Sequence, residues 1–157
     1  MKFQQSVPVI LLAVAALGVG PVQAQGRPGS SPVPYATSFV ITVASGNGAN
    51  GYSPDIVPAT KRLVIEFVSV AVVAQPGDKP ALYLNDSVNG ASRAYWVPLA
   101  MVETAASGAE VYRASQVVKL NHDGNGANGP GAQCSRYVNS FVPMTCQITV
   151  SGTLVDK

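Results

Sequence analysis

The sequence predicts an all-β domain, an antiparallel β-sandwich of jelly-roll type with about eight strands; a small closed β-barrel is the alternative. Charged residues make up 11% of the chain while Gly and Pro are frequent, which is typical of short strands joined by turns. Several segments alternate between apolar and polar residues or are rich in valine and isoleucine, and none carries the caps of a helix. Eight such strands must stack as two sheets or close on themselves, because one flat sheet would leave half of its apolar side chains in water.

The first 24 residues have the layout of a secretory signal peptide. Lys2 is followed by an uncharged apolar stretch from Val7 to Val19 and then by a small-residue tripeptide that ends at Ala24. The apolar stretch is shorter than the roughly 20 residues needed to cross a bilayer. We therefore expect cleavage after Ala24, and a periplasmic or extracellular mature chain with no transmembrane segment.

The mature chain begins with a leader and continues as one domain. Residues 25–34 (QGRPGSSPVP) are rich in Gly and Pro and predict a flexible leader. Residues 35–157 suit a single β-sandwich domain. Its first strand is expected over residues 35–43, where apolar and polar side chains alternate.

The remaining strands follow in order. A turn-rich stretch over residues 45–60 leads into the run LVIEFVSVAVVA, whose β-branched density predicts a buried central strand over residues 63–74. Further strands are expected over residues 81–84, 91–102 (with Pro98 at a bulge or edge), 110–120, 134–141 and 145–155, and residues 121–133 read as a loop.

Two cysteines, Cys134 and Cys146, lie in the mature part of the chain. An even count in an exported protein predicts a disulfide between them. A metal pair or a redox dithiol is the alternative, but the spacing is not C-x-x-C and the chain has one histidine.

The stretch VPATKRLVIEFVSV, a later Gly-Asn loop and the terminal ITVSGTLVD together resemble a group of small exported bacterial β-sandwich proteins. The resemblance covers the central strand and the last strand. It implies a β-sandwich fold and export, and it implies no activity.

The hexapeptide GNGANG occurs twice, at residues 46–51 and 124–129. The plain interpretation is that Asn-Gly supplies tight turns. If both loops lay at one end of the sandwich, their oxygen atoms could instead form a ligand or calcium site, with no other cofactor expected. The candidate ligands are Asn47, Asn50, Asp123, Asn125 and Asn128, although Ala127 and Cys134 stand where a calcium loop needs oxygen ligands.

Catalytic patterns are weak throughout. His122 is the single histidine and no G-x-S-x-G elbow accompanies it, so we expect a solvated loop histidine. Glu66 lies inside the apolar run, where a buried charge needs a partner such as Arg62, Arg113 or Arg136. A glycosidase interpretation would instead pair Glu66 with Glu103 or Asp86. The sequence therefore assigns no catalytic and no metal-binding residue.

Tyr95 and Trp96 are adjacent in an expected strand, so they face opposite sides. An exposed aromatic side chain on a sandwich can stack on a sugar ring. The competing expectation is that Trp96 packs in the core with Tyr95 at an edge.

Three functions remain open for the chain. The first is an exported, non-catalytic binding or structural β-sandwich with a carbohydrate or protein partner at the cell envelope. The second is a secreted carbohydrate-active hydrolase, and the third is a surface subunit that assembles with copies of itself. The net charge of +2 gives no reason to expect a nucleic-acid partner.

Overall fold

The computed structural model describes residues 31–138 and 140–157. The predicted signal peptide, residues 1–24, and most of the predicted leader lie outside the described residues. The first strand begins at Val33, inside the predicted leader, because Val33 pairs in register with Leu154 of the last strand.

Nine strands and no helix make up the regular structure of the described residues. Their bounds are β1 Val33–Val43, β2 Ala49–Tyr52, β3 Lys61–Ala74, β4 Pro80–Val88, β5 Ala91–Val97, β6 Ala100–Thr104, β7 Glu110–Asp123, β8 Gly131–Arg136 and β9 Met144–Asp156.

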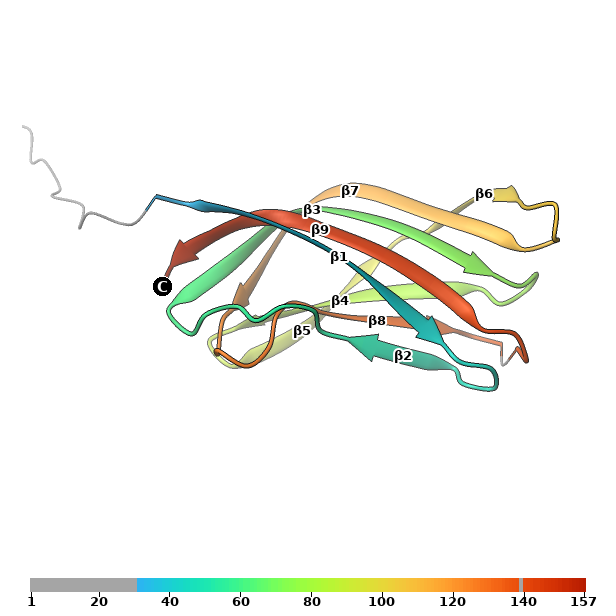
Figure 1. Cartoon of the computed structure of the whole chain (residues 1–157), viewed down its shortest axis with the longest axis horizontal. Coiled ribbons are helices and arrows are strands. Elements are labelled where there is room, and N and C mark those ends of the chain that lie inside the picture. The colour runs from blue at the N-terminus through green and yellow to red at the C-terminus, as the bar shows by residue number, and fades with distance from the viewer. Residues whose placement is uncertain (1–30, 139) are drawn as a thin grey trace, which may run out of the picture.

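The strands form two stacked layers (Figure 1). We call β1, β9, β3, β7 and β6, in this order, sheet one, and β2, β8, β4 and β5 sheet two. Four antiparallel pairs build the fold: β1 with β9, β2 with β8, β3 with β7, and β4 with β5. These are the pairs of one long hairpin rolled up on itself, which is the jelly roll, and β6 is an additional edge strand. The predicted jelly-roll sandwich is confirmed.

The sandwich is almost closed at its two sides. On one side, a single parallel bridge joins Ser87 of β4 to His122 of β7, so the pairing is mixed rather than purely antiparallel. On the other side, Asn50 Nδ2 of β2 donates a hydrogen bond to the carbonyl oxygen of Thr42 in β1 at 2.8 Å. Because hydrogen bonds bridge both sides, the sandwich is nearly closed into a barrel, which is the part of the barrel alternative that the structure retains.

The core lies between the sheets and consists of the inward-facing side chains of both. Leu63, Ile65 and Ile148 of sheet one and Leu82 and Leu84 of sheet two are almost completely buried. Cys134 of β8 and Cys146 of β9 form a disulfide across this core, which confirms the predicted bond and joins sheet two to sheet one.

The central strand β3 contains an irregularity at Glu66. The pairing of β3 shifts between Ile65 and Phe67 against both neighbouring strands. Ile65 faces the core, Glu66 and Phe67 are both exposed, and Val68 faces the core again. The expectation that Glu66 is buried is therefore wrong, because the irregularity changes the phase of the alternation; its Oε2 instead accepts a hydrogen bond from Thr153 Oγ1 at 3.1 Å.

Other boundaries also differ from the sequence pattern. The expected strand over residues 91–102 is interrupted at Pro98, and its halves β5 and β6 belong to different sheets. The expected loop over residues 121–133 is shorter, because β7 continues to Asp123 and β8 starts at Gly131.

Candidate functional site

The outer face of sheet two carries an ordered row of polar and aromatic side chains. Leu82, Leu84 and Val97 are buried, so the residues between them in β4 and β5 face outward. The register aligns four outward residues across four strands, namely Gly51 of β2, Gln133 of β8, Tyr83 of β4 and Trp96 of β5. Adjacent strands lie about 5 Å apart, so the row from Gln133 to Trp96 spans about 10 Å.

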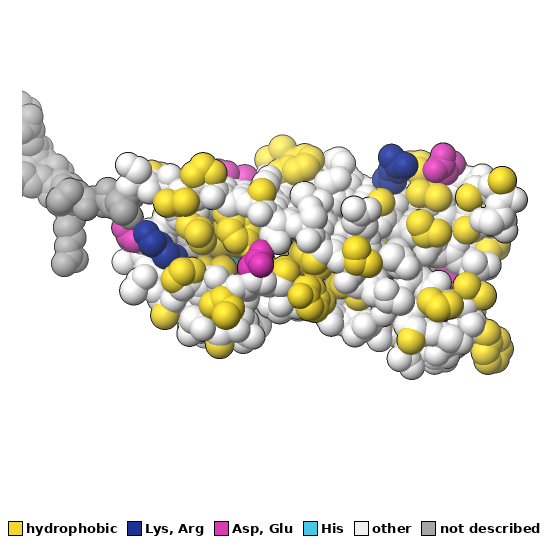
Figure 2. All heavy atoms as spheres, viewed as in Figure 1, with side chains coloured by type: hydrophobic (Ala, Val, Ile, Leu, Met, Phe, Trp, Pro, Cys, Tyr) yellow, Lys and Arg dark blue, Asp and Glu magenta, His cyan; other side chains and the backbone are white. Residues whose placement is uncertain are grey.

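No charged side chain belongs to this outer face within the four described strands. Its accessible residues are small, amide-bearing or aromatic: Ala49, Gly51, Tyr83, Asn85, Ser87, Ser92, Ala94, Trp96, Gly131, Gln133 and Ser135. On the side of the sandwich that Figure 2 shows, charged side chains likewise form isolated spots among apolar and uncharged surface. The face therefore suits an uncharged polar ligand better than an ionic one.

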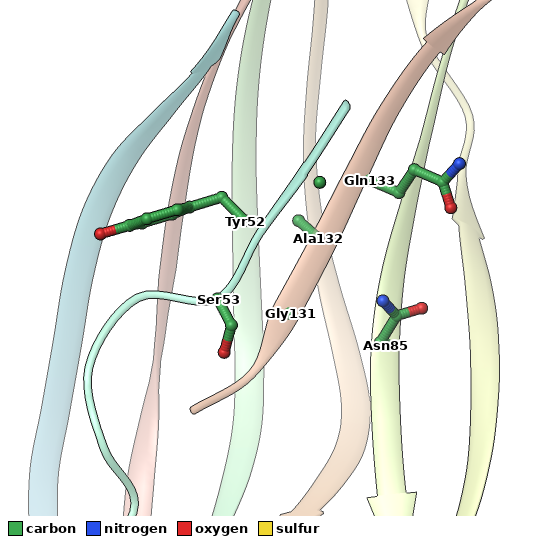
Figure 3. A pocket seen from close by; sticks show the side chains of 7 residues that line it. Tyr52, Ser53, Asn85, Gly131, Ala132 and Gln133 are labelled. Atoms are coloured by element: carbon green, nitrogen blue, oxygen red, sulfur yellow. The ribbon is translucent and has the colours of Figure 1, made fainter. Parts of the chain in front are cut away.

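A shallow hollow of about 470 Å³ lies at the β2 end of this face. Figure 3 shows the carboxamides of Asn85 and Gln133 close to one another beside β8, whereas Tyr52 points away from them. Neither carboxamide hydrogen-bonds to another described residue, so their donors and acceptors face solvent. A side chain at Gly131 would approach Asn85 Nδ2 to 3.3 Å, so glycine at this position keeps the hollow open.

The two adjacent aromatic residues of β5 have opposite environments. Trp96 is 61% exposed on the outer face, and Tyr95 packs against the core. The expectation that Trp96 fills the core is wrong, because its partner in register is Tyr83, whose neighbours Leu82 and Leu84 face inward. A hydrogen bond with Tyr137 raises the pKa of Tyr83.

The two Gly-Asn loops lie at opposite ends of the sandwich. Gly46 N donates to the carbonyl oxygen of Ser140, just before β9 begins. Lys157 Nζ donates to the carbonyl oxygen of Gly124, just after β9 ends. The structure therefore does not bring Asn47 and Asn50 together with the residues of the second loop.

The candidate calcium ligands of the second loop are engaged within the protein. Asp123 Oδ1 lies 2.6 Å from Arg62 Nε, and its Oδ2 accepts a hydrogen bond from Asn89 N at 2.9 Å. The hydrogen bond from Arg62 lowers the pKa of Asp123 to about 2. Asn125 Oδ1 accepts hydrogen bonds from the backbone N–H groups of Ala127 and Asn128, both at 2.8 Å. Among the residues that the structure describes, no cluster of His, Cys, Asp or Glu is arranged to hold a metal ion.

The repeated loops use glycine for different reasons. Gly46 has φ +75° and open space around it, so it serves a tight turn. Gly124 and Gly129 instead lie against the backbone of residues 54–58, where a side chain would collide with carbonyl oxygen atoms. The second loop is therefore a packing element that closes one end of the sandwich.

His122 is buried in β7, so the expectation of a solvated loop histidine is wrong. It is 7% exposed, and neither ring nitrogen has a hydrogen-bond partner among the described residues. Burial lowers the pKa of His122, although the nearby backbone of Asn128 and the carboxylates of Asp123 and Asp86 oppose the change.

The glycosidase carboxylates do not meet over a groove. Glu66 lies exposed in β3 of sheet one, and Asp86 follows Leu82 and Leu84 on the inward face of β4 in sheet two. Glu103 is on the exposed edge strand β6. No carboxylate lines the hollow of sheet two.

No protein-family model matches the chain, and the comparison with curated proteins finds no match. Solved structures similar to the chain include the cryo-EM structure of a virus-like particle of the Macrobrachium rosenbergii extra small virus, with 18% identity, coverage of 91% of this chain and 95% of that chain, and a TM-score of 0.29. The crystal structure of the 60-mer BFDV capsid protein has 7% identity, coverage of 80% and 92%, and a TM-score of 0.31. Because both TM-scores are below 0.5, these similarities support no conclusion about the partner or the activity of this chain.

Residues 31–138 and 140–157 contain no helix able to cross a membrane.

Proposed function

We propose that this protein is an exported, non-catalytic binding protein, and that the outer face of sheet two binds a neutral carbohydrate. The observation that carries the proposal is the row of Gln133, Tyr83 and Trp96 across three adjacent strands, with Asn85 beside it. The disulfide supports export, because such bonds persist in oxidising compartments.

The chemistry of this face matches the two kinds of surface that a sugar presents. The C–H face of a pyranose packs on an aromatic ring, and Trp96 offers a ring that is 61% exposed. Sugar hydroxyls donate and accept hydrogen bonds, as the carboxamides of Asn85 and Gln133 also do. The row from Gln133 to Trp96, about 10 Å long, fits one or two sugar units of a longer chain.

The test uses Trp96 as its own probe, because it is the single tryptophan of the chain. Neutral oligosaccharides from cell-wall and plant polymers are titrated while the tryptophan emission is followed. We expect a saturable shift of the emission to shorter wavelength with at least one of these sugars, because stacking removes water from the indole ring.

Variants then locate the site by calorimetry with the same sugar. Trp96→Ala and Gln133→Ala should each weaken binding by roughly tenfold or more without lowering the melting temperature. Phe67→Ala is the matched control, because Phe67 is an exposed aromatic residue on the other sheet. A sugar that binds both Trp96→Ala and the unmodified chain with one affinity would refute this face as the site, and the absence of binding across the panel would refute the carbohydrate ligand.

A second candidate function is self-assembly, and the edge strand β6 is the observation that favours it. All five residues of β6 are exposed, and they include Met101 and Val102. An exposed edge strand with apolar side chains can pair with the same strand of a second copy. Sedimentation should then show concentration-dependent oligomers that Val102→Lys abolishes, and a monomer at high concentration would exclude this function.

A further inference from the structure

A second hollow lies on the opposite side of the molecule, on the outer face of sheet one. It has a volume of about 250 Å³. Three strands contribute to it, and its lining residues are Ser69, Val70, Ala71, Arg113, Ser115, Gln147 and Thr149. We call this the sheet-one hollow.

The register explains the shape of the sheet-one hollow. Arg113, Ala71 and Gln147 form one row across β7, β3 and β9, so the guanidinium and the carboxamide flank a methyl group. Two small residues, Ser115 and Ser69, belong to the next row together with Thr149. Short side chains in the middle and long ones at the sides leave a depression over β3.

The side chains of the sheet-one hollow are rich in hydrogen-bond donors. Ser69 and Ser115 share a hydrogen bond at 3.3 Å, and Thr149 shares one with Ser38 at 2.7 Å. A hydroxyl that accepts a bond from its neighbour keeps its own hydrogen for a ligand. Arg113 contributes donors only, and no carboxylate lines the hollow.

Arg113 forms no ion pair within the described part of the chain. Its partners in register are Ala71 on β3 and Ala100 on β6. Glu103 lies further along β6, opposite Val111, and forms no ion pair with Arg113. The hollow therefore combines one positive charge with several neutral donors, whereas the outer face of sheet two carries no charge.

We propose that the sheet-one hollow binds an oxyanion group, a sulfate, a phosphate or a carboxylate. The guanidinium of Arg113 donates two parallel hydrogen bonds to the anion, as arginine does with such groups. The Gln147 carboxamide donates from the other side, and from the floor the accepting hydroxyl of the Ser69–Ser115 pair and the Thr149 hydroxyl, which accepts from Ser38, donate their free hydrogens. This proposal stands independently of sugar binding on sheet two, because the two sites share no residue.

The test is a titration followed by amide NMR spectra of the whole disulfide-bonded protein. Sodium sulfate and sodium phosphate are added at constant ionic strength against sodium chloride. We expect saturable shifts of the Ser69, Ala71 and Ser115 amides and of the Arg113 side-chain N–H, with the Trp96 indole unchanged. A sulfated monosaccharide, a uronic acid and the neutral parent sugar distinguish the source of the anion, and the neutral sugar should leave these amides unmoved.

Variants separate a specific site from general attraction of anions. Arg113→Gln should weaken binding roughly tenfold or more. The affinity of Arg113→Lys should lie between those of Arg113→Gln and the unmodified protein, because lysine keeps the charge without the planar fork. Thr149→Val should weaken binding with no change of charge. Glu103→Gln is the control, because it raises the local charge outside the hollow, and it should leave the affinity equal or slightly higher. Shifts that never saturate, or equal affinity in Arg113→Gln, would overturn the proposal.

Discussion

Arg136 and Asp78 form an ion pair with almost no access to solvent: Nη1 lies 3.4 Å from Oδ2, and the two side chains are 0% and 2% exposed. The guanidinium also donates to three backbone carbonyl oxygens, those of Ala44, Asn47 and Val142. One side chain thus ties together the β1–β2, β3–β4 and β8–β9 connections at one end of the sandwich.

Arg136→Met should lower the free energy of unfolding by about 3–5 kcal/mol, because it leaves the Asp78 carboxylate buried without its partner. Urea unfolding followed by far-UV circular dichroism measures the change. Arg93→Met is the matched control on the exposed part of β5 and should change stability by less than about 0.5 kcal/mol. Equal stability of the two variants would show that the buried pair contributes nothing.

The Cys134–Cys146 disulfide closes a short segment, with a sequence separation of 12, and links the two sheets. Its reduction should lower the free energy of unfolding by roughly 3 kcal/mol, since the reduced unfolded chain regains conformational freedom. Comparison of the oxidised and reduced protein in the same urea titration isolates this effect, because no side-chain volume changes. If both forms unfold at the same urea concentration, the bond has no role in stability.

His122 should make the protein less stable in mild acid. Its pKa is lowered by burial in the folded protein, while the unfolded chain keeps the ordinary value of 6.5. As the pH falls, the unfolded chain therefore takes up the proton first. The free energy of unfolding keeps its full value above pH 6.5 and declines as the pH falls below it. His122→Leu should remove this decline between pH 7 and pH 5, and melting temperatures across that interval provide the measurement. A variant that keeps the full decline would assign it to another group.

Asp123 should contribute a second loss of stability at lower pH. Its pKa is about 2 beside Arg62, against an ordinary value of 3.8, so the folded protein favours the carboxylate. This contribution is complete above about pH 4 and is lost as the pH falls toward 2. Asp123→Asn should show a weaker pH dependence over that interval in urea unfolding. Asp156→Asn is the control. The ion pair of Asp156 with Lys61 is more exposed, so this substitution should change the pH dependence of stability less than Asp123→Asn does.

The fold could be predicted from the sequence because the local pattern of apolar and polar residues indicates which strands are buried and on which face. Alternation and β-branched runs identified β1, β3, β7 and β9, and two cysteines in a chain with a predicted export signal indicated the disulfide. The irregularity at Glu66 cannot be recognised in the sequence, because a continuous run of apolar residues surrounds it and does not show which side chains face the core. The pairing of Arg136 with Asp78 joins residues 58 positions apart, and no local pattern encodes such a contact.

The candidate site was only partly accessible to sequence reasoning. Adjacent aromatic residues in a strand predict one exposed ring, but the register with Tyr83 decides that the ring belongs to Trp96. Gln133 was missed because the Gly-rich composition before it reads as a loop. The sequence suggests Arg113 only as a partner for Glu66, and its place beside Ala71 and Gln147 depends on two strand pairings that the sequence does not specify.

The pairing of β1 with β9 has a consequence for how the chain is made. Val33 lies opposite Leu154 and Val43 opposite Met144, so the first strand stays without its partner until the last strand has been synthesised. Contacts of such long sequence separation form slowly. A nascent chain that stops before residue 144 exposes the edges of β1 and β3 together, and such open edges pair readily with other chains. The nascent chain is therefore most exposed to wrong pairing until β9 inserts between β1 and β3.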